Sequence, residues 1–487
     1  MDRTAECPVV DRVERTAAQY PEHTAVVTAT ERFTYQELWC QVRRWQERCA
    51  ALMLPPGALI AVLAGSGASW PAAFLGARAA GLVPLLVDVQ QPAARVDAVL
   101  AAARPSAVLR PESDEAEPIA GPDRRILPAG AGYVVFSSGS QGTPKGIIGR
   151  AAGLLAFIDW EINTLGLGPG SRVAMLTSPS FDVVYRDLLL PLCCGGELHI
   201  AAPTVRATPA AVLPWLAGSA VEVLHAVPSL SARWLAAGPS TTVDSLRCTL
   251  FAGEPLYGRH VQRWRSAAPS TTVVNLYGPS ETTLAKFHYN VPADCDPGLQ
   301  PVGRPLPGAV LGLEPVGAAG TPTDAQQVVI TTPDGSLGYL PDTCSADDRN
   351  RLRCTGGVTR FRTQDRGLLD GTANLVIVGR LDSLVKRRGV FVDIASIEAA
   401  AAGLPGVRSA CCVQLTTSGD VVLVVEGPDP AAAAALRRPL RNALGPDMPD
   451  RVLALPALPL LPGGKADRRG IKELLHLEET ADDRQAS

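Results

Sequence analysis

The sequence predicts an α/β protein with two domains. Its 487 residues, 46% of them hydrophobic, are too many for one compact core. From residue 57 to residue 275, short β-branched apolar runs alternate with longer Ala- and Leu-rich runs, a pattern typical of stacked, mostly parallel β-α sheets. From residue 290 onward, short strands rich in Pro and Gly predict a β-rich subdomain. The last hundred residues predict a small α+β domain.

Each element of the β-α region can be assigned from its composition. The expected strands are residues 58–65, 83–89, 132–138, 172–178, 197–202, 221–227, 248–254 and 271–278. The expected helices are residues 70–81, 92–105, 151–166, 210–218 and 258–269. Open parallel sheets bind ligands at the carboxyl ends of their strands, so we expect the chemistry in the loops after these runs.

The C-terminal region continues with short strands and two helices. After the segments 303–315 and 331–341 of the subdomain, we expect strands at 375–382, 407–415 and 420–427, and helices at 396–404 and 430–445. We place the domain boundary at Asp382, which gives domains of residues 1–381 and 382–487. The polar residues after Leu477 are predicted to be disordered.

Charge and cysteine content exclude several classes of function. The formal net charge is −3, from 45 basic and 48 acidic residues that form no block of one sign. This argues against nucleic acid or a membrane surface as a partner. The eleven cysteines suit neither a disulfide framework nor a metal site and are expected to be reduced and mostly buried. The charged N-terminus lacks the apolar segment of a secretion signal, and no apolar run is long enough for a membrane span, so we expect a cytoplasmic protein.

The segment 133–146 combines an apolar strand with a loop of small and hydroxyl-bearing residues. Its glycines allow close backbone approach and its hydroxyl groups can donate hydrogen bonds, as a phosphate cradle requires. The residues concerned are Ser137, Ser138, Gly139, Ser140, Gln141, Gly142, Thr143, Lys145 and Gly146. It is not the phosphate loop of the NTPases, because Pro144 precedes the lysine and no Ser or Thr follows it. An ordinary strand-to-helix loop is the alternative interpretation.

Seven further motifs accompany this loop in a fixed order. They are AAGLVPLLVD (79–88), SFDVVYRD (180–187), FAGEPL (251–256), NLYGPSETT (275–283), FRTQDRG (361–367), GRLDSLVKRRG (379–389) and LPGGKADR (461–468). With these motifs the chain resembles, over nearly its whole length, the adenylate-forming superfamily of acyl-CoA synthetases, luciferases and nonribosomal peptide synthetase adenylation domains. It is most similar to a free-standing amino-acid adenylation domain.

The resemblance implies an ATP site with Mg²⁺. Tyr277 would stack on adenine with Asn275 beside it, and Ser280 would face the α-phosphate next to Gly278. Glu281 would hold the Mg²⁺ as a hard oxygen ligand. The remaining nucleotide contacts would come from Gly253, Glu254, Asp365 and Arg380, with Asp365 on the ribose hydroxyls. For the residues of the motif NLYGPSETT the alternative interpretation is an ordinary turn. For Asp365 and Arg380 it is a surface ion pair.

The resemblance also implies a catalytic lysine and a hinge. Lys465 would touch both the carboxylate and the α-phosphate and offset their repulsion. Asp382 would be the pivot on which a mobile C-terminal domain rotates between adenylate formation and transfer to a thiol. The region of Gly389 would line the path of a phosphopantetheine arm. Gln364 stands where the family has Gly, and residues 390–398 depart from the family's usual Gly-Glu-Ile-Glu ending.

The acid pocket is assigned by the same resemblance. Asp182 would hold the ammonium of an amino acid, because a buried carboxylate needs a charged partner; capping the helix that begins at Val183 is the alternative. The pocket positions are Val183, Arg186, His225, Leu250, Ala252, Leu276, Leu284 and Ala285, closed by Lys465. Unpaired, Arg186 would be costly among leucines. It either meets an acceptor on the substrate or turns away to pair with Asp187.

These residues give a specific functional hypothesis. We expect an amino-acid adenylating ligase that uses ATP and Mg²⁺ and serves a separate carrier protein with a phosphopantetheine arm in trans, in nonribosomal peptide or related natural-product biosynthesis such as that of antibiotics. A small activating protein is a further candidate partner, and the sequence leaves open whether one is needed. Two alternatives are an acyl- or aryl-CoA ligase and a non-catalytic nucleotide-binding relative, and Glu281, Asp365 and Lys465 speak against the latter.

Overall fold

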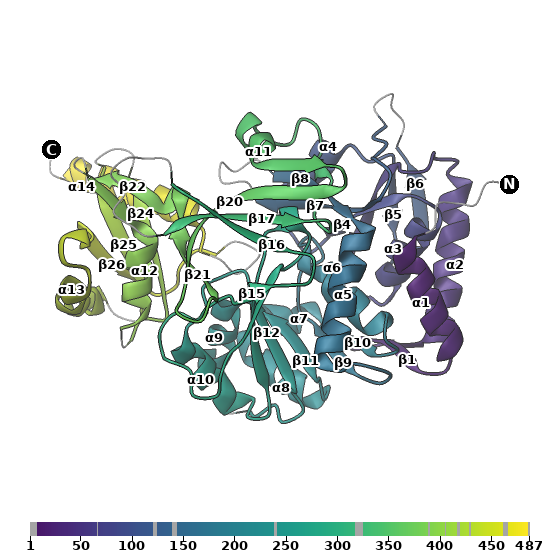
Figure 1. The fold of residues 1–487 in the computed structure, drawn as a ribbon, viewed down its shortest axis with the longest axis horizontal. Helices are drawn as coiled ribbons and strands as arrows, with labels where there is room; N and C mark the ends of the chain where they lie inside the picture. The colour runs from purple at the N-terminus through teal and green to yellow at the C-terminus, as the bar shows by residue number, and fades with distance from the viewer. Residues whose placement is uncertain are drawn as a thin grey trace. The chain divides into compact units, whose positions relative to one another are not determined.

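The chain forms two compact units, shown with their helices and strands in Figure 1. The computed structural model describes residues 7–65, 67–119, 124–138, 144–237, 241–316, 325–387, 390–404, 406–415, 419–427, 430–460 and 466–485. The large unit contains Met1–Gly312 and Val329–Thr363, and the small unit contains Leu313–Val328 and Gln364–Ser487. The division thus falls at Gln364, before the predicted boundary at Asp382, and a rotation about Asp382 stays a prediction.

One sheet of the large unit has seven strands in the order β18-β8-β7-β4-β3-β5-β6. They are β3 (Leu59–Ala64), β4 (Val83–Asp88), β5 (Ala107–Arg110), β6 (Glu115–Pro118), β7 (Ala131–Ser138), β8 (Pro144–Arg150) and β18 (Gly338–Tyr339). Strands β5, β3, β4 and β7 are parallel, whereas β8 runs antiparallel to β7. Both faces of β3 are buried, so its sequence is a continuous apolar run.

The second sheet of the large unit has nine strands in the order β15-β14-β13-β12-β11-β9-β10-β1-β2. They are β1 (Thr24–Val27), β2 (Arg32–Thr34), β9 (Arg172–Met175), β10 (Glu197–Ile200), β11 (Val223–Ala226), β12 (Cys248–Ala252), β13 (Thr272–Tyr277), β14 (Phe287–Asn290) and β15 (Arg304–Pro305). The strands from β1 through β13 in this order are parallel. Their carboxyl ends therefore meet at one edge of the sheet.

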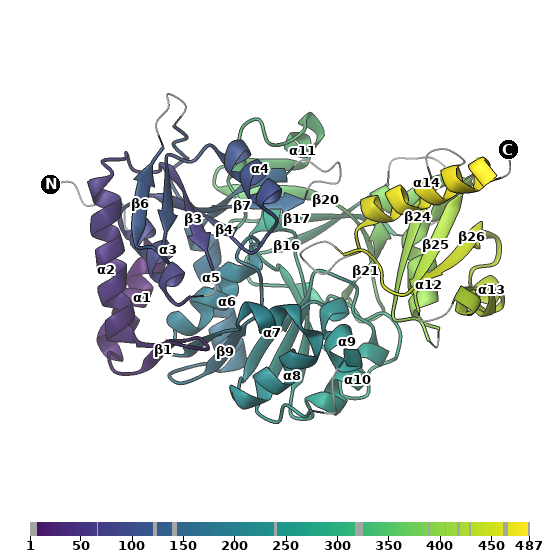
Figure 2. The ribbon, with the colours of Figure 1, turned by 180° about the vertical axis from the view of Figure 1, so that it is seen from behind.

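Helices cover both sheets of the large unit. They are α1 (Pro8–Gln19), α2 (Tyr35–Ala51), α3 (Ser69–Ala79), α4 (Ala93–Ala103), α5 (Ala151–Leu165), α6 (Val183–Leu192), α7 (Pro203–Ala207), α8 (Pro209–Gly218), α9 (Pro228–Ala237), α10 (Gly258–Ala267) and α11 (Ala346–Arg351). Helices α5 and α6 lie side by side, as both ribbon views show (Figures 1 and 2). Their apolar residues share one core with the facing strands of both sheets.

A five-stranded sheet has the order β16-β17-β20-β19, with β21 also paired to β20. Its strands are β16 (Val310–Glu314), β17 (Gln326–Thr332), β19 (Leu352–Thr355), β20 (Val358–Leu369) and β21 (Leu375–Arg380). In the antiparallel pair of β20 and β21, Asp365 lies opposite Arg380. This sheet is the β-rich part that the Pro- and Gly-rich segment predicts.

The small unit packs helices on both faces of a three-stranded sheet. Its elements are β22 (Leu384–Arg387), β23 (Val390–Asp393), α12 (Ile394–Ala402), β24 (Ser409–Gln414), β25 (Val421–Glu426), α13 (Pro430–Leu444), β26 (Arg451–Leu455) and α14 (Arg468–Gln485). Alternate residues of β25 point to opposite faces: Leu423 packs with α12 and α13, and Val424 packs with Ile471 of α14. The order of strands and helices agrees with the predicted α+β pattern.

The α/β fold class is confirmed, and each of the strands expected between residues 57 and 275 is present. The prediction of a disordered tail is wrong, because α14 continues to Gln485. Glu and Ala in this tail are strong helix formers, and Ile471 and Leu475 anchor the first turns of the same helix in a core. The helices at residues 8–19, 35–51 and 228–237 were not predicted, whereas the helix that begins at Val183 was expected.

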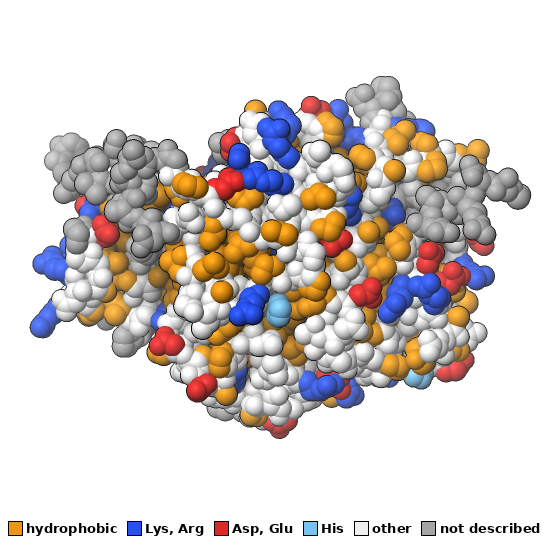
Figure 3. All heavy atoms as spheres, viewed as in Figure 1, with side chains coloured by type: hydrophobic (Ala, Val, Ile, Leu, Met, Phe, Trp, Pro, Cys, Tyr) orange, Lys and Arg blue, Asp and Glu red, His pale blue; other side chains and the backbone are white. Residues whose placement is uncertain are grey.

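Surface and cysteine features also agree with the sequence. No helix among the described residues is long and apolar enough to cross a bilayer. On the face in Figure 3, blue basic and red acidic side chains are interspersed, and no block of one sign covers it. The eleven cysteines are free, and most are buried.

The close packing of α2 against α3 gives a test of the fold. A Cβ at Gly76 of α3 would lie 2.5 Å from the Trp45 Cβ and 2.7 Å from the Val42 carbonyl oxygen of α2. We expect Gly76→Ala to destabilise the large unit by about 1–3 kcal/mol, because the two helices must separate. Thermal unfolding would measure the effect. Gly218→Ala is the control: it adds a methyl group where nothing lies within 4 Å, and should be neutral or slightly stabilising. Equal behaviour of the two variants would contradict this packing.

Candidate active site

The predicted phosphate loop lies between the end of β7 and the start of β8. Ser137 lies opposite Lys145 in the antiparallel pair, and Ser138 lies opposite Pro144. The backbone of Gly146 donates a hydrogen bond to Thr343 Oγ1, 3.0 Å away. Gly139, Ser140, Gln141, Gly142 and Thr143 lie outside the described residues, so their contact with phosphate stays a prediction.

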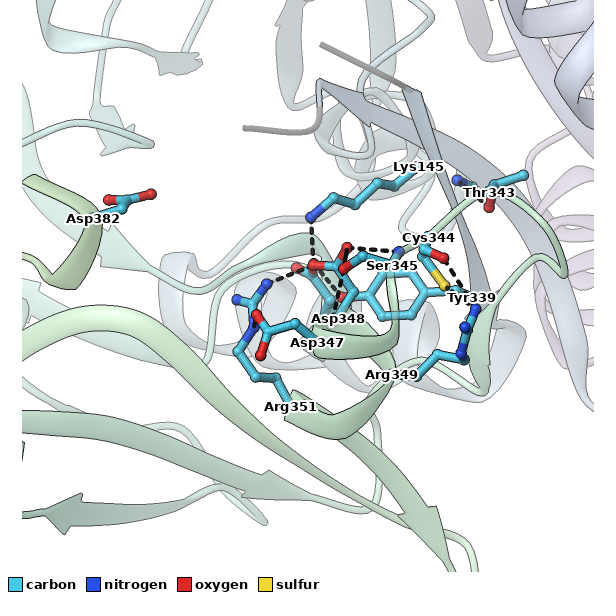
Figure 4. Close-up of polar contacts among 12 residues, drawn as sticks. Lys145, Tyr339, Thr343, Cys344, Ser345, Asp347, Asp348, Arg349, Arg351 and Asp382 are labelled. Carbon is cyan, nitrogen blue, oxygen red and sulfur yellow. Dashed lines mark hydrogen bonds and ion pairs between the residues drawn. The ribbon is translucent and has the colours of Figure 1, made fainter. Parts of the chain in front are cut away.

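Lys145 is held by a buried carboxylate (Figure 4). Its Nζ lies 2.5 Å from Asp348 Oδ1, and Arg351 donates to the same oxygen. The other oxygen of Asp348 accepts hydrogen bonds from the backbone and hydroxyl of Ser345, which closes a capping box at the start of α11. Burial opposes ionisation, but the Lys145 and Ser345 hydrogen bonds outweigh it and lower the pKa of Asp348. The ion pair thereby holds the side chain of Lys145, the second residue of β8, next to the start of α11.

Sequence reasoning missed Asp348 and Arg351. The signal that could have found the helix is the pattern Ser345-Ala-Asp-Asp348, because a hydroxyl residue followed three positions later by an acidic residue marks a helix start. The partner of the carboxylate could not be found in this way, because Lys145 lies 203 positions earlier in the chain.

Glu281 lies in a short 3₁₀ turn (Ser280–Thr282) just after β13. The hydroxyl of Tyr339 donates to its Oε1 at 2.8 Å. Burial raises the pKa of Glu281, while the Tyr339 hydrogen bond and the Lys145 charge oppose that rise and the Asp182 charge adds to it. These interactions place Glu281 in the same charged neighbourhood as Lys145 and Asp182.

The donor set around Glu281 fits a magnesium ion that is bound mainly through phosphate. No group of three or more His, Cys, Asp or Glu side chains among the described residues could hold a metal ion. Mg²⁺ commonly binds through one or two carboxylates together with substrate phosphates and water. A single carboxylate such as Glu281 matches that mode.

The backbone after Glu281 adopts an uncommon conformation. Thr283 and Leu284 have φ angles of 61° and 59°, in the left-handed region that side chains other than Gly rarely occupy. Backbone hydrogen bonds from Thr283 to Ser280 and from Lys286 to Tyr277 hold this turn in place. Residues with strained backbone angles are common at functional sites that require one fixed geometry. Here it fixes Leu284, one of the predicted pocket residues.

The other predicted nucleotide residues of the large unit lie at strand ends. Tyr277 ends β13, its ring centroid 5.8 Å from that of Phe287. The Asn275 amide donates to the Pro301 carbonyl at 2.8 Å. Gly253 follows β12 with a φ of +87°, and the Glu254 carboxylate accepts a hydrogen bond from the Ser229 backbone. A Cβ at Gly278 would lie 2.6 Å from the Leu284 carbonyl oxygen, so this position requires glycine.

Three predicted residues form an ion-pair cluster within the small unit. Arg380 makes two hydrogen bonds of 2.8 Å to the Asp382 carboxylate and a longer one of 3.3 Å to Asp365. Asp365 is the least exposed of the three side chains, with 15% of its surface accessible. Burial opposes ionisation of Asp382, but Arg380 outweighs it and lowers the pKa of that carboxyl. The predicted hinge residue is thus tied to the arginine two positions before it.

The apolar pocket positions gather in one hydrophobic core. This core includes, as buried members or as half-buried residues packed against it, Val183, Leu250, Ala252, Leu276, Leu284 and Ala285. The strand register explains the gathering: His225 lies beside Leu250, and two residues further along Ala252 lies beside Leu276. Because side chains alternate along a strand, these positions share one face of the sheet.

Asp182 does not serve as a helix cap. It occupies the position before α6, but its side chain makes no capping hydrogen bond. Burial is the main cause that raises the pKa of Tyr133 and Tyr185, and the Asp182 charge contributes to both shifts. The half-buried carboxylate therefore lies near two buried phenols. Asp182 does not cap α6, which was the alternative interpretation of this residue.

Arg186 and His225 belong to a buried network of four charged side chains. Arg186 Nε lies 3.4 Å from Asp187 Oδ1, while His225 lies 3.0 Å from that oxygen through Nδ1 and 2.8 Å from Glu161 Oε1 through Nε2. Each side chain is at most 4% exposed. Burial and Arg186 lower the pKa of His225, but the two carboxylates outweigh them and raise it overall.

This network includes two of the predicted pocket residues. His225 is hydrogen-bonded to Glu161 through Nε2, whereas its Nδ1 lies 3.0 Å from Asp187 Oδ1 without a hydrogen bond among the described residues. Arg186 pairs with Asp187 through its Nε, and its Nη1 and Nη2 make no hydrogen bond among the described residues. Glu161, on α5, was missed because nothing in the sequence marks a residue 64 positions from His225 as its partner.

Lys465, the predicted catalytic lysine, lies outside the described residues, as does Gly389. The roles of Lys465 in catalysis and of Gly389 in thiol access therefore stay predictions.

Comparisons with known proteins identify the family of this chain. The model of the AMP-binding enzyme family matches residues 13–130 and 122–314. The L-proline–[L-prolyl-carrier protein] ligase of Pseudomonas fluorescens is 26% identical, over 94% of this chain and 97% of that protein. A dimodular nonribosomal peptide synthase of Bacillus subtilis is also 26% identical, over 95% of this chain and 20% of that protein. This chain spans only 6%, 38% and 42% of three further relatives that it matches.

Solved structures share the fold. The structure of Klebsiella oxytoca NpsA in complex with 3-hydroxyanthranilyl-AMSN superposes with a TM-score of 0.81 at 20% identity, over 96% of this chain and 99% of that one. The family match covers well over half of the chain, and the strand-end motifs occur in the family's order. The chain therefore belongs to the AMP-binding enzyme family and is an adenylate-forming ligase.

Proposed function

We propose that this ligase activates an amino acid as its aminoacyl-AMP and passes the aminoacyl group to the phosphopantetheine thiol of a separate carrier protein. In the first step a carboxylate oxygen attacks the α-phosphorus of ATP, and the bond to the β-phosphate breaks to release pyrophosphate. In the second step the thiol displaces AMP and a thioester forms. No covalent bond to the enzyme is required.

The observation that carries the proposal is the state of Asp182. Its half-buried carboxylate makes no capping hydrogen bond. Asp182 directly precedes α6 and is next to Val183, which packs against the apolar core that contains the pocket positions. A carboxylate in such surroundings favours a cationic ligand. The α-ammonium of an amino acid supplies that cation, whereas fatty and aryl acids do not.

The adenylation step requires the enzyme to bring two anions together. Lys145 and Lys465 would supply positive charge to phosphate and carboxylate oxygens, and Glu281 would hold Mg²⁺ against the phosphates. The bound magnesium supplies further charge neutralisation at the phosphate oxygens. Arg351 holds the Asp348 carboxylate beside Lys145, so the lysine can leave that carboxylate for a phosphate without leaving Asp348 unpaired.

The transfer step distinguishes this proposal from a CoA ligase. A prolyl-carrier protein ligase and a nonribosomal peptide synthase are among the relatives, which supports a carrier protein as acceptor. The test has two parts: ATP-pyrophosphate exchange with a panel of amino, aryl and fatty acids, then transfer to holo carrier protein or to CoA. We expect an amino acid to win the first part and the carrier the second. Activation of aryl acids alone, followed by transfer to CoA, would contradict the proposal.

The role of Asp182 gives the first prediction at the site. We expect Asp182→Ala to raise the KM for the amino acid by roughly 10²-fold, because the ammonium loses its counter-charge. The KM for ATP should change little. Steady-state exchange kinetics would measure both constants. Asp182→Glu is the matched variant and should keep part of the amino-acid affinity, since the charge remains. An equal loss for both substrates would assign Asp182 a structural role.

The role of Lys465 gives the second prediction. Lys465→Ala should lower the adenylation rate by about 10² or more, the scale of losing one preorganised charge contact, with the fold intact. Single-turnover formation of the adenylate would measure the rate, and circular dichroism would check the fold. Lys472→Ala, which removes a lysine from α14, is the control and should leave the rate near that of the native enzyme. Near-normal adenylation by the Lys465 variant would exclude the assignment.

The Lys145–Asp348 ion pair gives the third prediction. Lys145→Ala should raise the KM for ATP by about 10- to 100-fold, as expected for the loss of a charge-assisted hydrogen bond to phosphate. Asp348→Asn keeps a hydrogen-bond acceptor for Ser345 but no longer fixes the lysine, so a smaller rise is expected. Arg349→Ala is the control, because this exposed arginine of the same helix bonds only to Cys344 among the described residues. ATP kinetics unaffected by either substitution would refute a phosphate role for Lys145.

A further inference from the structure

The charged network of Glu161, Arg186, Asp187 and His225 includes two residues of α6, the helix that follows Asp182. Asp182 directly precedes α6 and has helical backbone angles, and Arg186 follows it by four positions, so the two side chains project from the same face, one helical turn apart. One turn rises about 5.4 Å. A substrate held by its α-ammonium at Asp182 therefore directs a short side chain toward Arg186. The inference that follows rests on this proposed binding mode.

The four side chains balance one another in charge. Two carboxylates face one guanidinium and one imidazole, and the carboxylates favour the protonated imidazole. The network is thus neutral when His225 is protonated. Any charge that a substrate side chain brought to it would be uncompensated in a buried site, and buried charges without a partner are strongly disfavoured. Both acidic and basic side chains are excluded on this ground.

The network nevertheless keeps unused hydrogen-bonding groups. Glu161 Oε2, Asp187 Oδ2 and His225 Nδ1 are fully buried and have no hydrogen-bond partner among the described residues. The Arg186 guanidinium makes its one hydrogen bond among the described residues through Nε, which leaves Nη1 and Nη2 without an acceptor there. Buried donors and acceptors that stay unpaired destabilise a protein, and a ligand that pairs them gains correspondingly. The Arg186 guanidinium therefore lacks an acceptor, and the free carboxylate oxygens of Glu161 and Asp187 lack a donor.

We propose that the network selects an amino acid whose side chain is neutral and both donates and accepts hydrogen bonds, for which a carboxamide is the best match. The carboxamide oxygen accepts from Arg186, and its NH₂ group donates to the free carboxylate oxygen of Asp187. Glu161 is a positioning residue: it holds His225 away from the substrate and sets the charge of the network. Neither Glu161 nor Asp187 is among the pocket positions assigned from the sequence.

The native enzyme gives the first arm of the test. ATP-pyrophosphate exchange is measured with asparagine, glutamine, leucine, aspartate, glutamate and lysine. We expect one of the two amides to exceed leucine and the charged side chains by about 10²-fold or more in kcat/KM, because a site built for hydrogen bonds rejects a substrate that lacks them. Preference for leucine, or for any of the charged amino acids, would overturn the inference and leave the proposed adenylation of amino acids intact. Activation of aryl acids alone would instead overturn the proposed function.

The second arm tests the positioning role of Glu161. Glu161→Gln removes one negative charge at nearly constant shape and leaves the network with a net positive charge. We expect the ratio of glutamate to glutamine activation to rise by about tenfold or more, mainly through KM. Glu197→Gln is the matched control, because Glu197 forms a similar pair with His199, 3.0 Å apart, on β10. A loss of stability shared by both variants with an unchanged ratio would show that Glu161 has a structural role only.

A third variant keeps the test decisive if Glu161→Gln yields no folded protein. Arg186→Gln removes one positive charge from the same network, so the shift should run the other way. We expect the ratio of lysine to glutamine activation to rise by about tenfold or more. A ratio that stays at the native value in a folded Arg186→Gln enzyme would contradict the charge-balance argument.

Discussion

The parallel register of β11, β12 and β13 is the constraint on which the rest of the site depends. Because the three strands run in the same direction, their carboxyl ends reach one edge of the nine-stranded sheet, and alternation places His225, Leu250, Ala252 and Leu276 on one face. Helices α5 and α6 then cover that face with apolar residues. The gathering of the predicted pocket positions is therefore a consequence of strand direction and spacing, and the left-handed turn that contains Leu284 adds this residue to the same core.

Electrostatics explains why the charged residues of the site are arranged as they are. Each strongly buried charge that the structure describes in the large unit has a counter-charge or a hydrogen-bonding partner: Lys145 has Asp348, His225 has Glu161, and Glu281 has the Tyr339 hydroxyl. Asp182 lies near Glu281 and the two buried phenols of Tyr133 and Tyr185, and its side chain makes no capping hydrogen bond to α6. The acidic groups near Asp182 match the charge of the proposed ammonium, and Lys145 supplies the opposite charge for the proposed triphosphate.

The sequence predicted local features well and long-range contacts poorly. Strands such as 83–89 and 221–227 could be predicted because apolar β-branched runs mark buried strands whatever their partners are. The motif residues Glu281, Tyr277 and Asp365 could be named because each lies in a short string with a characteristic order. By contrast, Asp348 and Glu161 contact Lys145 and His225 across long stretches of chain, and only the folded protein brings them together. The tail after Leu477 was misjudged because low hydrophobicity was given more weight than helix propensity.

The measurement that tests the central claim most directly is ATP-pyrophosphate exchange by the native enzyme with an amino acid and its des-amino analogue, matched in side chain. If the half-buried Asp182 carboxylate selects its substrate through the α-ammonium, the amino acid should be activated about 10²-fold or more better in kcat/KM, and the difference should shrink in Asp182→Ala. Equal or better activation of the des-amino acid by the native enzyme would contradict the account.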